Sequence, residues 1–138
     1  MTGNVPSTDT WRNVAIDGFI DLIGPLMSRS ENDQKIYGLQ TGPQHVNAVG
    51  IIHGGVVTSL LDQTMAMEAW KAAKRQPTVT VQMDTRFIAA AKAGDLLETR
   101  VNIRHGTKSM MFVDADVYCT DRLIATATAV MKIIRKAG

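Results

Sequence analysis

The sequence has a single cysteine, few aromatic residues and almost no net charge. Cys119 has no second cysteine with which to form a disulfide within the chain, which is typical of a reduced, cytoplasmic setting. Fifteen basic and thirteen acidic residues give a formal net charge of +2, too small to indicate a nucleic-acid-binding protein. The aromatic content of 5% leaves little for base stacking. We therefore expect neither a disulfide nor a nucleic-acid partner.

Uninterrupted apolar runs are missing as well. Asp17 and Asp21 interrupt the apolar residues 14–27, so we expect no secretory signal, and no run approaches the roughly 20 residues of a membrane-spanning helix. Motifs of serine hydrolases, nucleotide hydrolases and zinc proteases are absent, and His45 and His105 have no partners at metal-ligand spacing. These absences predict a cytoplasmic protein with no membrane contact, no metal and no redox cofactor.

The length of 138 residues suits one domain, 1–138, with a single core. Residues 1–8 are mostly small and polar, and we expect them to be flexible. Apolar residues recur at helical spacing over residues 10–27, which predicts an amphipathic N-terminal helix. Gly24 and Pro25 should weaken or end it.

A second, longer helix is expected in the middle of the chain. Before it, the polar residues 28–34 predict a loop and residues 35–41 a short strand. Residues 54–75 contain no proline and carry apolar side chains on nearly all sides, as in a helix buried in the centre of a fold. Lys71 in the last turn suits the negative end of the helix dipole, and Pro77 follows the helix.

Beyond Pro77 the apolar period changes from about 3.6 residues to 2, as in strands. Strands are predicted over residues 79–87, 97–104, 109–119 and 123–134. In the first strand, Thr80 alternates with the apolar residues and shares the polar side with Gln82 and Asp84. In the last, alternate small alanines would let a thick element pack closely. The pattern predicts an α+β fold in which an antiparallel sheet packs on a central helix.

Two glycines stand where the central helix begins. Gly54 and Gly55 follow Asn47 and His53 and lead directly into the helix. Glycine lets the backbone approach a ligand, and the unpaired N–H groups of a helix start can stabilise an oxyanion together with the helix dipole. The alternative interpretation is that the two glycines only permit a tight turn into the helix.

Asp62 is a carboxylate among apolar residues of the same helix. A buried carboxylate is costly unless it is hydrogen-bonded or functional, although Ser59 and Gln63 beside it would also suit an exposed stripe. Eight residues separate Gly54 from Asp62, about 12 Å along a helix, so one carbonyl group can hardly touch both. A site shared across a dimer would resolve this distance.

These residues resemble a known family. The pattern Asn-x-x-Gly-x-x-His-Gly-Gly over residues 47–55, then Asp62, then Pro-Thr-Val-Thr-Val-Gln-Met from Pro77 is similar to the phenylacetic-acid-degradation (PaaI-like) branch of hotdog-fold acyl-CoA thioesterases. The resemblance runs from about Ile36 to Ile134. It implies a hotdog fold, in which an antiparallel sheet wraps around a long central helix, and hydrolysis of an acyl-CoA to a free acid and CoA.

The resemblance also implies roles for the site residues. Asp62 would act as general base or nucleophile, and Thr80 would orient the water. The Gly54 N–H group and the Asn47 side chain would bind and polarise the thioester carbonyl. His53 would orient its loop or contact the substrate.

Further residues are expected to hold CoA, which is part of the substrate and not a separate cofactor. The CoA-binding residues implied are Gly55, Arg104, Gly106, Thr107 and Lys108, with weaker candidates in Lys92 and Arg100, while Met65, Met67 and Trp70 could shape an acyl pocket or fill the core. The assembly implied is a homodimer or a dimer-of-dimers homotetramer. Two other functions stay open: a hotdog enoyl-CoA hydratase or dehydratase, and a non-catalytic acyl-CoA-binding protein.

Overall fold

The computed structural model describes residues 11–134. The elements in chain order are β1 (Arg12–Asn13), α1 (Phe19–Ile23), β2 (Leu26–Glu31), β3 (Gln34–Gln40), the 3-10 turn η2 (Pro43–His45), α2 (Gly54–Ala72), β4 (Thr78–Phe87), β5 (Leu96–Gly106), β6 (Met110–Cys119) and β7 (Arg122–Ile133). The seven strands form one antiparallel sheet in the order β1-β2-β3-β5-β6-β7-β4.

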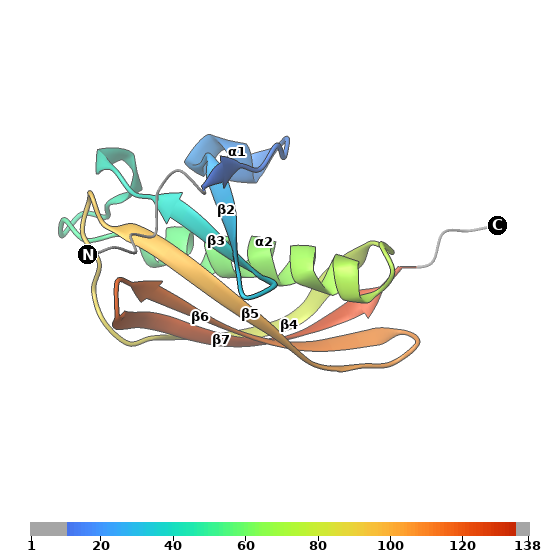
Figure 1. Cartoon of the computed structure of the whole chain (residues 1–138). Helices are drawn as coiled ribbons and strands as arrows, with labels where there is room; N and C mark the ends of the chain where they lie inside the picture. The colour runs from blue at the N-terminus through green and yellow to red at the C-terminus, as the bar shows by residue number, and fades with distance from the viewer. Residues whose placement is uncertain (1–10, 135–138) are drawn as a thin grey trace.

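The central helix lies lengthwise against the curved face of the sheet (Figure 1). Its sheet-facing side chains are buried, and Leu60, Leu61 and Met65 have no exposed surface. Opposite them, the alanines 125, 127 and 129 of β7 are also buried, which allows the helix backbone to approach the strand. The predicted α+β arrangement, an antiparallel sheet around a long central helix, is confirmed.

The N-terminal helix expected over residues 10–27 is wrong in its extent. Only Phe19–Ile23 is helical, and Arg12–Asn13 forms β1 instead. The apolar residues of this region differ in burial, because Ile20 is buried whereas Phe19 and Leu22 are exposed. The Trp11 ring lies against Gly38 of β3, where an added Cβ would come within 2.7 Å of it. Tertiary packing therefore overrides the helical spacing. Residues 1–8, expected to be flexible, lie outside the described residues.

The loop expected over residues 28–34 is also wrong. Leu26–Glu31 is strand β2 and pairs with β3, whose strand begins at Gln34, and only Asn32 and Asp33 form the turn. Both turn residues have positive φ, a conformation that Asn and Asp tolerate better than most residues.

Helix α2 ends at Ala72, three residues before the expected end at residue 75. Lys74 and Arg75 both adopt the left-handed conformation, with φ of 58° and 66°. The Arg75 N–H donates to the Trp70 carbonyl at 2.7 Å and the Lys74 N–H to the Lys71 carbonyl at 3.2 Å. These bonds satisfy carbonyls that the helix end leaves open and turn the chain toward β4.

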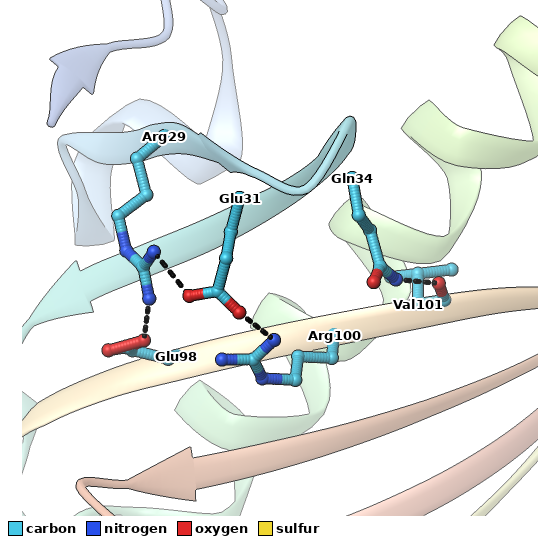
Figure 2. Close-up of polar contacts among 6 residues, drawn as sticks. All are labelled: Arg29, Glu31, Gln34, Glu98, Arg100 and Val101. Atoms are coloured by element: carbon cyan, nitrogen blue, oxygen red, sulfur yellow. Dashed lines mark hydrogen bonds and ion pairs between the residues drawn. The ribbon is translucent and has the colours of Figure 1, made fainter. Parts of the chain in front are cut away.

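An ion-pair network joins β2 to β5 across the strand between them (Figure 2). The Arg29 guanidinium donates to Glu31 and to Glu98, both at 2.8 Å, and Arg100 donates to Glu31 at 3.0 Å. The two arginines hold the pKa of Glu31 below its usual value. Arg100 is thus engaged in the fold, and its expected contribution to CoA binding has no support from its position.

A buried hydroxyl on β5 gives a test of the core. Thr99 has no exposed surface, and its Oγ1 finds no hydrogen-bond partner among residues 11–134. Such a group costs about 1–3 kcal/mol when buried. We expect Thr99→Val to raise the free energy of unfolding by about 1 kcal/mol, measured by urea denaturation.

A second threonine provides the matched control. Thr64 is equally buried, but its hydroxyl donates to the Leu60 carbonyl at 2.8 Å. Thr64→Val should give no such gain. A lower unfolding free energy for Thr99→Val would show that the Thr99 hydroxyl has a partner in solution.

Within residues 11–134, no helix is long and apolar enough to cross a membrane. No group of three or more side chains in this part of the chain could hold a metal ion.

Candidate active site

Asp62 and Thr80 meet between the central helix and the edge strand. The Thr80 hydroxyl donates to the Asp62 carboxylate, with Oγ1 and Oδ1 at 2.6 Å. Asp62 is half-buried in the middle of α2, and Thr80 is exposed near the start of β4. The pair thus combines a carboxylate oxygen fixed by a hydrogen bond with access from solvent.

A β-bulge brings Thr80 to the helix. Thr80 is the register partner of Met131, whereas Gln82 is the partner of Val130, so Val81 is an extra residue in β4. The side-chain alternation is reset there. Thr80 consequently faces α2 on the same side as Met83, and the expected place of Thr80 among the outward polar residues is wrong.

The helix start holds a second polar cluster. A cavity of about 290 Å³ is lined by Asn47, Gly54 and Phe87 together with apolar residues of both flanking loops. The His53 ring caps the helix by accepting a hydrogen bond at Nδ1 from the Gly55 N–H at 2.8 Å. The Gly54 N–H, in contrast, has no partner among residues 11–134, so it can donate to a ligand.

Asn47 presents its amide nitrogen for the same purpose. Its Oδ1 accepts from the Val49 N–H at 3.1 Å and from the Ile51 N–H at 3.2 Å. Since the oxygen is turned into its own loop, the Nδ2 group is the part left to donate. Asn47 and Gly54 therefore provide two N–H donors to one cavity, as an oxyanion site requires.

The two clusters are separate within one chain. The cavity at Asn47 and Gly54 includes neither Asp62 nor Thr80, and the step of eight positions along the helix from Gly54 to Asp62 corresponds to about 12 Å. Within one chain, the two polar clusters are therefore not joined.

Strand β4 is an open edge of the sheet. It pairs with β7 on one side, and within residues 11–134 no strand lies on its other side. Three of its apolar side chains are well exposed: Val79, Val81 and Phe87, at 45, 54 and 58%. An apolar edge of this length is a surface on which another strand can pair.

A mostly apolar groove, here called the helix-face cleft, lies along α2 and has neither Asp62 nor Thr80 in its lining. It has a volume of about 620 Å³, and its lining includes Gln63, Met67 and Trp70 of α2, Ile16, Tyr37 and Pro77. Two of the residues expected at an acyl pocket, Met67 and Trp70, thus line a cleft, whereas the third, Met65, is completely buried in the core. Met65 cannot line a pocket in this conformation.

The residues expected to bind CoA lie in different parts of the structure. Thr107 and Lys108 line a cleft at the far end of α2, and Gly106, the last residue of β5, lies against Met111 of that cleft. Arg104 instead forms an ion pair with Asp114 at 3.3 Å. Gly55 is at the helix start, far along α2 from this group.

Two residues that the sequence did not suggest share the cleft with Thr107 and Lys108. Lys74 and Arg75 line it from the turn after α2. In the sequence they read as ordinary basic residues at a helix end, and no local signal marks them. Only the return of the chain from α2 to β4 places them opposite the β5–β6 turn.

The thioesterase superfamily model matches residues 49–126 of the chain. The Pseudomonas aeruginosa esterase candidate PA0474 is 30% identical over 116 residues, which cover 83% of this chain and 87% of that protein. Human acyl-coenzyme A thioesterase 13 is 29% identical over 84 residues, covering 59% of this chain and 60% of that protein.

Solved structures show the same fold. The Escherichia coli PaaI protein from the phenylacetic acid degradation operon has a TM-score of 0.74 at 18% identity, over 86% of this chain and 85% of that one. A thioesterase-type protein of Streptococcus pneumoniae, solved with coenzyme A, has a TM-score of 0.73 at 20% identity, over 82% of this chain and 91% of that one.

Proposed function

The chain belongs to the thioesterase superfamily, and on that premise we propose that it hydrolyses acyl-CoA thioesters to a free acid and CoA. The observation that carries the proposal is the hydrogen-bonded pair of Asp62 and Thr80, in which a half-buried carboxylate on the central helix is held by an exposed hydroxyl. The similarity to acyl-coenzyme A thioesterase 13 and to a fold solved with coenzyme A supports the choice of thioester.

In the proposed reaction Asp62 activates the attack on the thioester carbonyl. The Thr80 hydroxyl occupies Oδ1, which leaves Oδ2 to accept a proton from water as the water oxygen bonds to the carbonyl carbon. The C–S bond then breaks, and the CoA thiolate takes up a proton. Direct attack by Asp62 would pass through an anhydride instead. Label found in Asp62 by mass spectrometry after one turnover in ¹⁸O-water would demonstrate the anhydride, with water attacking the Asp62 carbonyl carbon, because the general-base route never places label in Asp62.

The oxyanion of the tetrahedral intermediate is bound by the Gly54 N–H and the Asn47 Nδ2 group. Both donors are free of other partners within the described chain, and the N-terminus of a 19-residue helix adds its positive dipole. His53 has an indirect role. Its Nδ1 accepts a hydrogen bond from the Gly55 N–H, which caps the helix and fixes the backbone at Gly54.

The complete site is proposed to form between two copies of the chain. Thr80 lies near one end of β4, and Phe87, whose ring is 3.3 Å from where a Cβ on Gly54 would stand, lies at the other end. If two β4 edges pair antiparallel about a two-fold axis, Thr80 of each copy comes opposite Phe87 of its partner. Asp62 of one chain is then brought to Gly54 of the other.

The resemblance to the family also supports a more specific proposal for the branch, the assembly and the compartment. We assign the chain to the PaaI-like branch, as a dimer or a dimer-of-dimers tetramer acting in the cytoplasm. Light scattering on the active protein tests the assembly. A fully active monomer would contradict the shared site.

A substitution at Thr80 tests the positioning of Asp62. Thr80→Val keeps a β-branched side chain but removes the hydroxyl that donates to Asp62. Since a hydrogen bond to a charged group contributes about 1.5–3 kcal/mol, we expect kcat to fall by roughly 10- to 100-fold. The measurement is thiol release from an acyl-CoA at saturating concentration.

Thr80→Ser is the control, because it retains the hydroxyl. It should keep most of the activity. Equal losses in the Ser and Val variants would mean that the methyl group, not the hydrogen bond, is what matters at this position.

A further inference from the structure

The helix-face cleft carries positive charge between mostly apolar walls. Its volume of about 620 Å³ is typical of sites for small molecules. One wall is α2, and the wall facing it comes from the β2–β3 hairpin, which extends over the helix (Figure 1). Lys35 of the hairpin and Lys71 of the helix line the cleft, and no Asp or Glu of residues 11–134 does. The charges that a ligand meets there are therefore positive.

The charge of Lys71 is balanced within the chain. Its Nζ pairs with the Glu68 carboxylate at 2.7 Å, and the Tyr37 hydroxyl donates a hydrogen bond to the same carboxylate. Burial and this hydrogen bond raise the pKa of Tyr37, so the hydroxyl stays protonated and continues to donate. Lys71, Glu68 and Tyr37 thus form a cluster with no net charge.

Lys35 is the cation of the cleft that has no such partner. It is half-buried, and within residues 11–134 it forms no ion pair. Lys35 precedes Tyr37 by two residues in β3, so both side chains lie on the face of the strand that is turned toward α2. Lysines are mostly exposed or paired, because an ammonium group loses hydration when it is partly buried. A half-buried ammonium group without a partner is therefore suited to bind an anion.

The Asp62–Thr80 pair lies just outside the cleft. Asp62 does not line it, but Ala66, one turn further along the same side of α2, does. Thr80 does not line it either, but Thr78, on the same face of β4, does. The step from Asp62 to Ala66 corresponds to about 6 Å along the helix. An acyl group whose carbonyl is held at Asp62 can reach the cleft over this distance.

The distance to Lys35 sets the length of the acyl group. Glu68, which accepts the Tyr37 hydroxyl, follows Asp62 by six positions, or about 9 Å along the helix. Lys35 is two residues from Tyr37 in the strand, and its side chain is long and flexible. An anion at Lys35 would thus stand on the order of 10 Å from the thioester, which suits an acyl chain of medium length.

We propose that the helix-face cleft binds the acyl groups of ω-carboxyacyl-CoA esters, the mono-thioesters of dicarboxylic acids, and that Lys35 pairs with their distal carboxylate. The methylene groups of the chain contact the apolar side chains of Met67 and Trp70 in the lining. A chain that ends in a methyl group would instead leave the Lys35 ammonium group without a partner, and this difference produces the preference. The inference rests on the proposed function, which places the thioester at Asp62.

The test compares the full-length wild type with Lys35→Met, which keeps an apolar stem but removes the charge. The substrates are adipoyl-, suberoyl- and sebacoyl-CoA and the matching hexanoyl-, octanoyl- and decanoyl-CoA, and kcat/KM is measured by thiol release. Lys35→Arg keeps the charge. The second control, Lys132→Met, removes the charge of an exposed lysine of β7 that does not line the cleft. Calorimetry with non-hydrolysable thioether analogues of suberoyl- and octanoyl-CoA measures the preference without turnover.

We expect the wild type to have a higher kcat/KM for at least one dicarboxylic ester than for the monocarboxylic ester of the same length. Lys35→Met should lower this ratio by roughly 10-fold, since one charge-assisted contact is lost. Its kinetics with the monocarboxylic esters should match those of the wild type, which also shows that the variant is folded. Lys35→Arg and Lys132→Met should keep the wild-type ratio.

A ratio that Lys35→Met leaves unchanged, in a protein that hydrolyses both series of esters, would overturn the inference and leave the proposed function intact. An equal loss of activity toward both series has the same meaning, because Lys35 would then act on the fold and not on the carboxylate. If no thioester is hydrolysed, but the wild type binds the carboxylate-ended thioether more tightly than Lys35→Met does, the proposed function fails and the assignment of the cleft stands.

Discussion

Asp62→Asn should reduce kcat for acyl-CoA hydrolysis by roughly 10²- to 10⁴-fold, the contribution typical of a positioned acid or base. Asparagine has the shape of aspartate, and its amide oxygen can still accept the Thr80 hydroxyl that now lies 2.6 Å from Oδ1. The second carboxylate oxygen, which would take the proton from water or attack the carbonyl, becomes an NH₂ group. The loss should therefore appear in kcat, with little change in the folded state.

Asp121→Asn is the matched control for this variant. Asp121 is an exposed carboxylate in the turn between β6 and β7, away from α2 and β4 in the sequence. It should retain wild-type turnover. Thermal melting of both variants verifies folding, and an Asp62→Asn protein that melts normally and keeps full activity would remove Asp62 from the mechanism.

Mixed dimers of two inactive variants should regain about half of the wild-type activity, because a two-fold dimer with shared sites has two equivalent active sites. One partner carries Asp62→Asn, and the other carries Gly54→Val, whose side chain would press on the Phe87 ring and fill the cavity that Gly54 and Asn47 line. If each site takes Gly54 from one chain and Asp62 from the other, one site of the mixed dimer contains both wild-type residues. The other site contains both substitutions.

Differently tagged chains, co-expressed and purified in tandem, give the mixed dimer for thiol-release assays. Each variant alone should be nearly inactive. Mixed dimers that remain as inactive as the two parents, with their composition verified by mass spectrometry, would mean that each chain uses its own Gly54 and Asp62.

Helices and strands that bury the same face from end to end could be predicted from the sequence. Helix α2 is apolar nearly all round because it lies between the sheet and further elements, and strands β5, β6 and β7 alternate because one face packs on that helix. The N-terminal region differs, because only some of its apolar residues are buried: Ile20 is buried, whereas Phe19 and Leu22 are exposed. Trp11 lies against Gly38, a contact that no local spacing reveals.

The candidate site was predicted in its residues but not in its geometry. Thr80 reaches Asp62 only because the bulge at Val81 resets the alternation of β4, and a strict period of two would turn its side chain away. An extra residue in a strand depends on how the partner strand pairs, so the single sequence does not show it.

The places of the basic side chains could not be predicted from the sequence either. Arg104, expected at CoA, stands at a second bulge, between Ile103 and His105, and pairs with Asp114. Lys74 and Arg75 reach the cleft at the far end of α2 only through the left-handed turn after the helix. The sequence shows that these residues are basic, but the tertiary structure decides where their side chains lie.

The most direct test of the central claim is the balance of products from wild-type protein given a panel of acyl-CoAs, including phenylacetyl-CoA, its hydroxylated derivatives and medium-chain esters. Free thiol is measured by absorbance, and the acid and any hydrated acyl-CoA by mass spectrometry. We expect one CoA thiol and one free acid for each thioester consumed. Hydration of an enoyl-CoA with the thioester intact, or tight binding of acyl-CoA without turnover, would contradict it.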